Sequence, residues 1–151
     1  MMHTTRAQVI AEALTWVDTP WQHHAKVKGP QGGVDCVQLM VGIAQHCGLL
    51  DPAWVTPEYS PEWHLHNQQE LFLEVLERLG MCPLPVQVRQ PGDLLVFQYT
   101  RVCNHTGLFV AQDPEQVIHA DYALGRVVHQ GLNGKLLHRL RSVYTLPGIE
   151  G

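Results

Sequence analysis

A cysteine lies where a loop turns into a helix in this 151-residue chain, and it is the first residue that could do chemistry. The turn-forming segment 30–33 leads into Asp35 and Cys36, and an apolar helical pattern follows at once. The first turn of a helix carries unpaired backbone N–H groups and the positive end of the helix dipole, so it favours an anion. We therefore expect the thiol to lose its proton more easily there and to act as a nucleophile. The alternative is that Cys36 is a small buried hydrophobe, as Cys47 on the same face would be.

Two histidines in the second half could serve this cysteine. His105 opens the predicted strand 105–112, and His119 lies in the predicted strand 117–122. Side chains on neighbouring antiparallel strands can stand side by side on one face. One ring could then form a thiolate–imidazolium pair with Cys36 while the other orients it. Each histidine alone is typical of an ordinary sheet residue, so the prediction depends on the combination.

The cysteine pattern argues against a zinc ribbon and against a disulfide framework. The chain has four cysteines and no CxxC pair, and they are Cys36, Cys47, Cys82 and Cys103. We expect reduced thiols, no cofactor and no metal. One metal alternative stays open, a zinc site formed by Cys36, His105 and His119, which would need a fourth ligand if it were structural.

The amino-acid composition limits the classes of protein to which this chain can belong. Hydrophobic residues make up 45% and charged residues 16% of the chain, which is typical of one globular domain, here spanning residues 1–151. The formal net charge is −4, and the ten Lys and Arg residues are dispersed. Phosphate neutralisation needs clustered cations, so we do not expect nucleic acid as a partner.

The N-terminal segment does not resemble a signal peptide. Gln8 and Glu12 interrupt its apolar run. No segment approaches the roughly 20 apolar residues that a membrane-spanning helix needs. We therefore expect synthesis in the cytoplasm without a signal peptide and without a membrane span.

The element pattern predicts helices first and an antiparallel sheet second. Helical periodicity indicates helices from Thr4 or Thr5 to about Val17, from about Asp35 to Cys47, and over 67–80. Strand signals follow at 91–99, 105–112, 117–122, 125–130 and 141–146. This order predicts an α+β fold with helices on one face of a five- to six-stranded antiparallel sheet.

The long connection 51–66 holds Trp54, Tyr59 and Trp63. These aromatics either form an apolar wall of a cleft or cap the core. His23 and His24 precede the cysteine, and they either border the site or are solvated loop residues.

Taken together, the chain resembles the NlpC/p60 family of papain-like cysteine peptidases, most closely its phage-tail-associated branch. The matching segments cover nearly the whole chain: RAQVIAEALTWVDTPW, GGVDCVQLM, YSPEW, PGDLLVF, NHTGLFV and VIHA. The resemblance implies Cys36 as nucleophile, His105 as general base and His119 as polar third member. It also implies hydrolysis of peptidoglycan stem peptides, often at a γ-D-glutamyl bond to a diamino acid. Asp35 would hold the substrate's free amine, or it would be a helix N-cap.

Two departures from the family concern substrate recognition. Many relatives have Ser-Gly after the cysteine where this chain has Val37 and Gln38, so a hydroxyl is missing. Trp21 replaces a tyrosine usual in the family and keeps an aromatic wall for the substrate without its hydroxyl.

The resemblance leaves rival functions open. The chain could be a catalytically weak or inactive phage-tail assembly module, or an amidase or acyltransferase on the same scaffold. Phage-tail proteins are then expected partners, with a virion tail or delivery to the host cell envelope as its location.

Overall fold

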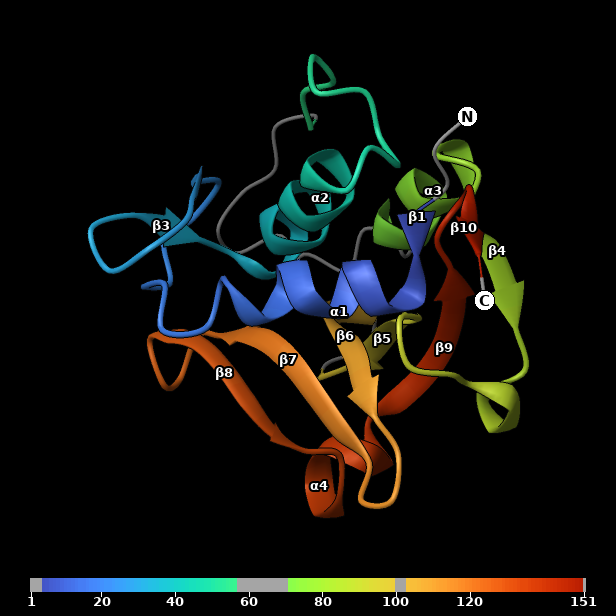
Figure 1. Ribbon diagram of the computed structural model, residues 1–151. Helices are drawn as coiled ribbons and strands as arrows, with labels where there is room; N and C mark the ends of the chain where they lie inside the picture. Colours follow the sequence, from blue (N-terminus) through green and yellow to red (C-terminus); the bar gives the residue numbers. More distant parts are fainter. Residues whose placement is uncertain (1–3, 57–70, 100–102, 151) are drawn as a thin grey trace.

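A six-stranded sheet carries the structure, and every pair of neighbouring strands in it is antiparallel (Figure 1). The computed structural model describes residues 4–56, 71–99 and 103–150. In spatial order the strands are β4 (Cys82–Leu84), β9 (Leu140–Thr145), β5 (Leu94–Gln98), β6 (Cys103–Ala111), β7 (Gln116–Asp121) and β8 (Arg126–Gly131). The predicted α+β class and sheet size are confirmed. β4 was not predicted, because it is a three-residue edge strand with a proline in its centre.

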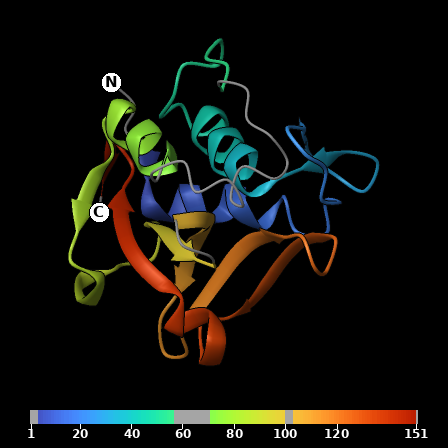
Figure 2. The ribbon, with the colours of Figure 1, turned by 180° about the vertical axis from the view of Figure 1, so that it is seen from behind.

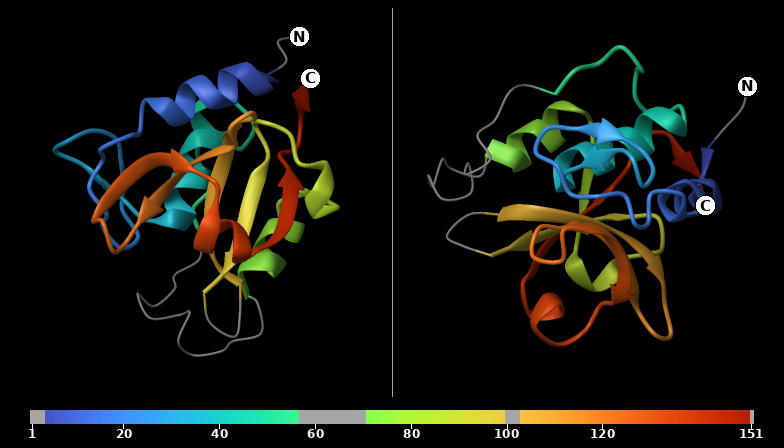
Figure 3. Two further views of the ribbon diagram at one scale, coloured as in Figure 1. Left: turned by 90° about the horizontal axis from the view of Figure 1, so that it is seen from below. Right: turned by 90° about the vertical axis from the view of Figure 1, so that its left-hand side faces the viewer.

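The sheet is buried on both faces. Leu94 and Val96 of β5 point to one core cluster, whereas Leu95 and Phe97 point to another. Helices α1, α2 and α3 cover the first face, and the short helix α4 (Gly134–His138) lies on the second (Figure 3). The sequence pattern predicted helices on one face only. A strand covered on both sides reads as a continuous apolar run, so periodicity cannot reveal the second cover.

Helix α1 (Arg6–Leu14) begins at a capping box. The Thr5 hydroxyl accepts from the Gln8 N–H, and the Gln8 side chain accepts from the Thr5 N–H. The helix ends at Leu14, three residues before the predicted end at Val17. Residues 15–18 form turns instead, and Trp16 is buried in the core. The apolar periodicity therefore continues beyond the helix because the turn packs into the same core.

Helix α2 (Cys36–His46) follows the prediction closely. Asp35 is its N-cap, and Gly48 adopts a left-handed conformation (φ +74°) just beyond its end. Helix α3 (Leu71–Arg78) occupies the described part of the third predicted helix. Trp54 is half-buried and packs against the core, which supports core capping for this aromatic. Tyr59 and Trp63 lie outside the described residues.

Five further short elements were not predicted. β1 (Thr4–Thr5) pairs in parallel with β10 (Ile149–Glu150), so the two ends of the described chain lie together (Figure 2). β2 (Lys26–Val27) and β3 (Gly33–Val34) form a hairpin that leads directly into α2. A turn of 3₁₀ helix, η2 (Val86–Val88), connects β4 to β5.

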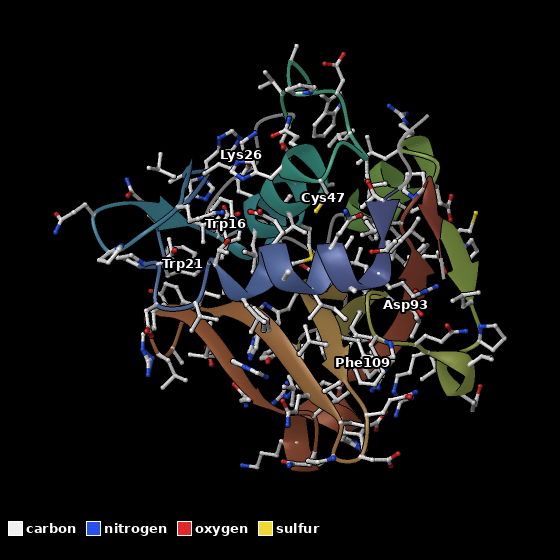
Figure 4. The ribbon with its side chains drawn as sticks, in the orientation of Figure 1. Trp16, Trp21, Lys26, Cys47, Asp93 and Phe109 are labelled. Carbon is white, nitrogen blue, oxygen red and sulfur yellow. The ribbon has the colours of Figure 1, made fainter. Side chains whose placement is uncertain are left out.

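A buried ion pair joins helix α1 to the sheet. Asp93 is completely buried, and its Oδ1 accepts from Arg6 Nη1 at 2.7 Å (Figure 4 labels Asp93). Its Oδ2 accepts from the Gln90 N–H at 2.8 Å, and the Thr145 hydroxyl lies 3.3 Å from Oδ1. One carboxylate thus connects α1, the turn before β5, and β9.

Replacing Arg6 by leucine should lower the free energy of unfolding by about 3 kcal/mol, because it leaves the buried Asp93 carboxylate without its counter-ion. Arg126→Leu is the matched control, since Arg126 and Asp18 are exposed and 3.7 Å apart. It should cost less than about 1 kcal/mol. Urea unfolding of both variants measures the difference, and equal costs would contradict the role given to Asp93.

Candidate active site

Three side chains on consecutive strands form a hydrogen-bonded chain. His105 Nε2 of β6 lies 2.7 Å from His119 Nδ1 of β7, and the rings meet edge to face. His119 Nε2 lies 2.8 Å from Gln130 Oε1 of β8. His119 is buried, whereas His105 is partly exposed. The structure therefore brings together the two histidines that the sequence paired.

Gln130 determines which ring nitrogen can take up a proton. An amide oxygen only accepts, so His119 Nε2 carries a hydrogen and, in the neutral ring, His119 Nδ1 is an acceptor. His105 Nε2 must then donate to His119 Nδ1. This arrangement leaves His105 Nδ1 with a free lone pair, which is the property a general base requires.

Burial keeps both rings neutral. It lowers the pKa of His105 well below 6.5, and the neighbouring His119 lowers it further. Burial also lowers the pKa of His119, while the hydrogen bond to Gln130 and the Asp121 carboxylate act in the opposite direction. At neutral pH the pair is thus uncharged, and His105 is available as a base rather than as an imidazolium.

Cys36 is positioned by the cap of α2 and by strand β6. The Asp35 carboxylate accepts from the Gln38 N–H at 2.8 Å and so fixes the first turn of the helix. The Thr106 hydroxyl donates to the Cys36 carbonyl oxygen at 2.9 Å. Thr106 is fully buried and follows His105 in β6. The hydrogen bond between Thr106 and Cys36 therefore joins the helix that carries the cysteine to the strand that carries His105.

The thiol is not the ready thiolate that the helix position predicted. Burial, and after it the negative charge of the adjacent Asp35 carboxylate, raises the pKa of Cys36 from 9.0 to about 12. Contacts with Thr106 and with the Val37 N–H favour the thiolate but do not outweigh these effects. The expected lowering by the helix N-terminus is therefore overcome by desolvation and by a neighbouring negative charge.

Some predicted partners are not joined by a hydrogen bond. The hydrogen bonds of the described residues include the His105–His119 pair but none between the Cys36 thiol and either ring. Within the same part of the chain, no group of three or more His, Cys, Asp or Glu side chains is arranged to hold a metal ion. The zinc alternative is thus not formed by these side chains as they stand.

Asp35 has the N-cap role that was one of its two predicted roles. Its side chain is buried, and its Oδ2 accepts from the His24 N–H at 2.7 Å. His23 Nδ1 lies 3.8 Å from the same oxygen. Both loop histidines are half-buried beside the start of α2, so they border the site rather than extend into solvent.

Trp21 lies beside the segment that leads to Cys36. It forms a parallel bridge with Val34, and its ring packs edge-on against Tyr122 with centroids 4.8 Å apart (Figure 4 labels Trp21). Tyr122 is 75% exposed in the turn between β7 and β8. Val37 and Gln38, which replace the Ser-Gly of many relatives, are both buried.

The sequence did not identify Gln130 or Thr106. Thr106 is adjacent to His105, so strand alternation alone indicates that its side chain points to the opposite face, toward α2. The position of Gln130 beside His119 depends on the register of β7 and β8. In this register His119 lies opposite Val128, and Val117 lies opposite Gln130. That register is fixed by the turn at 122–125, whose geometry the sequence does not specify.

Alkylation of Cys36 should accelerate with pH well beyond 9, because a raised thiol pKa means that thiolate appears only at alkaline pH. Iodoacetamide labelling at a series of pH values, followed by peptide mass spectrometry, measures this rate. N-acetylcysteine in the same series gives the profile of an unperturbed thiol. A Cys36 rate that is already constant at neutral pH would show a preformed thiolate–imidazolium pair and contradict the assignment.

Gln130→Leu should abolish the preference of His105 for the Nε2–H tautomer, because His119 then has no fixed acceptor. The ring nitrogens can be assigned by ¹⁵N–¹H correlation spectra of labelled protein. Gln116→Leu is the matched control, since Gln116 Oε1 accepts from His129 Nε2 at 2.7 Å on the surface. It should leave the His105 tautomer unchanged. An unaltered His105 spectrum in Gln130→Leu would disprove the role of Gln130.

Comparison with known proteins identifies solved structures that share the fold of this chain. No protein-family model and no curated protein matches the chain. Among solved structures, the NlpC/p60 domain of the peptidoglycan hydrolase SagA aligns with a TM-score of 0.60 and 16% identity, over 93% of this chain and 98% of that one. An NlpC/P60 family protein from Bacillus cereus aligns with a TM-score of 0.67 and 16% identity, over 97% of this chain and 41% of that one.

A third structure, the peptidoglycan hydrolase RipB from Mycobacterium tuberculosis, aligns with a TM-score of 0.60 and 14% identity. The match covers 94% of this chain and 64% of RipB. The chain therefore has the fold of NlpC/p60 domains. In the described part of the chain, the helices are too short or too polar to cross a membrane.

Proposed function

We propose that this protein is a cysteine peptidase that hydrolyses peptidoglycan stem peptides, at a γ-D-glutamyl bond to a diamino acid. The observation that carries the proposal is the junction of α2 and β6, where Thr106 ties Cys36 to the strand of the His105–His119–Gln130 chain. The fold supports it, since SagA and RipB are peptidoglycan hydrolases with the same architecture.

Acylation begins from neutral groups. His105 Nδ1 takes the thiol proton as Cys36 Sγ forms a bond to the scissile carbonyl carbon. Transferring the proton within the pair avoids forming a lone buried thiolate, which the raised thiol pKa opposes. The backbone N–H of Cys36, at the start of α2, donates to the resulting oxyanion. His119 stabilises the His105 imidazolium through the Nε2–Nδ1 hydrogen bond.

The second half of the cycle restores the thiol. The tetrahedral intermediate collapses, the C–N bond breaks, and His105 gives its proton to the leaving amine. Water then attacks the thioester while His105 takes up a proton from it. The C–S bond breaks, the carboxylic acid leaves, and the proton returns to sulfur. Cys36 and His105 are the residues that exchange atoms with substrate in this scheme.

Substrate recognition is assigned to the two residues beside α2. Asp35 would bind a free amine of the stem peptide in addition to capping the helix, because a carboxylate can accept more than the two backbone bonds it already has. Trp21, packed on the exposed Tyr122, would form an aromatic wall for the peptide. The buried Val37 and Gln38 give no exposed hydroxyl at the position of the family's serine.

A second candidate is a non-catalytic interaction module of the same fold, such as a phage-tail assembly protein. The raised pKa of the Cys36 thiol, together with a thiol that makes no hydrogen bond to the described histidine rings, favours this candidate. An amidase or acyltransferase would use the same acyl-enzyme with a different substrate or with an acceptor other than water.

Digestion of purified peptidoglycan and of defined muropeptides tests the proposal. Wild-type protein should release cleaved stem peptides, and mass spectrometry of the products identifies the bond. Cys36→Ala should lower the rate at least about a thousandfold, because it removes the nucleophile.

Cys47→Ala is the matched control, since this half-buried cysteine ends the same helix and lies outside the site. It should keep full activity. Cleavage that survives Cys36→Ala would overturn the peptidase mechanism. Intact substrates with wild-type protein would favour the interaction module, and products joined to an amine acceptor would identify an acyltransferase.

A further inference from the structure

Three strand ends meet beside His105. Phe97 of β5 lies opposite both His105 of β6 and Leu140 of β9, so these residues form a row across the sheet. Gln98 follows Phe97 in β5, and its N–H donates to the Arg139 carbonyl oxygen at 2.8 Å. Both pairings of β5 are irregular here, with register shifts on either side of Phe97. Such irregularities redirect side chains, and here they accompany a row of contacts from Arg139 through Tyr99 to His105.

The guanidinium of Arg139 lies over the ring of Tyr99. Its Cζ is 4.4 Å from the ring centroid, within the range of a cation–π contact. The Tyr99 ring in turn meets the His105 ring at a centroid distance of 5.2 Å and an angle of 62°. A single aromatic ring therefore separates a permanent positive charge from the proposed general base.

The charges of this corner act on one another. Burial has the largest effect on the pKa of the Tyr99 phenol and raises it; the Asp121 carboxylate raises this pKa too, as a Cys36 thiolate would, and the positive charge of Arg139 lowers it. The phenol thus lies close enough to sense both Arg139 and Cys36.

The guanidinium has no acidic partner among the described residues. Elsewhere in that part of the chain, Arg6 and Arg89 pair with carboxylates at 2.7 Å. Arg139 is only half-buried, so part of the residue is accessible. A guanidinium stacked on a ring still presents its N–H donors in its own plane, in a fork that fits a carboxylate.

We propose that Arg139, held by Tyr99 beside His105, is a specificity residue that binds a carboxylate of the peptide substrate. The inference rests on the proposed peptidase function and names the group by which the site selects its substrate. The α-carboxylate of a γ-linked glutamyl residue suits this site, because it belongs to the same residue as the scissile carbonyl. Stacking limits the freedom of the guanidinium before binding, so less entropy is lost when the carboxylate binds.

A pair of peptides that differ only at this carboxylate gives a direct test. The probes are L-alanyl-γ-D-glutamyl-L-lysine and the same peptide with its α-carboxylate converted to a carboxamide. Wild-type protein should cleave the acid with a kcat/KM about tenfold above that of the amide, since a charged hydrogen bond is lost in the amide. Arg139→Gln should cleave both peptides at the lower rate, with the change in KM rather than in kcat.

Arg141→Gln is the matched control. It removes the same charge two residues away, and Arg141 donates to the carbonyl oxygens of His138 and Leu140 rather than facing the site. It should keep the preference for the acid. The backbone bond from Gln98 to Arg139 does not involve the Arg139 side chain, so Arg139→Gln should melt near the wild-type temperature.

A binding experiment separates failure of the inference from failure of the proposed function. Calorimetric titration of Cys36→Ala protein with each peptide should show about tenfold tighter binding of the acid, lost in the Cys36→Ala/Arg139→Gln double variant. Preferential binding without cleavage by wild-type protein would sustain the carboxylate site and overturn the peptidase. Cleavage with no acid preference would sustain the peptidase and overturn the site. Absence of both preference and binding would overturn the assignment of Arg139.

Discussion

The contact between the first turn of α2 and strand β6 is the constraint on which the site depends. Thr106 is fully buried between the two elements, and its hydroxyl donates to the carbonyl oxygen of Cys36. The cysteine precedes His105 by 69 positions in the chain, so only packing can bring their elements together. Because α2 and β6 both contribute to the same core cluster, the hydrophobic effect supplies the association, and the Thr106 bond fixes its register.

Burial explains the protonation states in the site and the strength of its hydrogen bonds. Desolvation keeps the Cys36 thiol protonated and the two imidazoles neutral, so none of these three groups needs a buried counter-ion. The same low dielectric strengthens the two hydrogen bonds that join His105, His119 and Gln130. A proton can then move from sulfur to nitrogen within the site, without either group first exchanging it with solvent.

The strands differ in what they contribute. β6, β7 and β8 provide the hydrogen-bonded chain of His105, His119 and Gln130, which sets the tautomer. Tyr99, just after β5, and Arg139, just before β9, place a positive charge on the other side of His105. One part of the sheet thus governs proton transfer and the other governs charge recognition, with His105 between them.

Local sequence was sufficient to predict helix α2 and the strands that carry His105 and His119. The Asp35 cap, the apolar face of α2 and the strands around His105 and His119 depend on neighbours within a few positions, so the periodicity and turn signals located them. Tertiary structure alone decided the rest. It overcame the helix N-terminus with desolvation and raised the pKa of Cys36, it placed Gln130 on His119 through strand register, and it stacked Arg139 on Tyr99. These features depend on what surrounds a side chain in space, which a one-dimensional pattern does not encode.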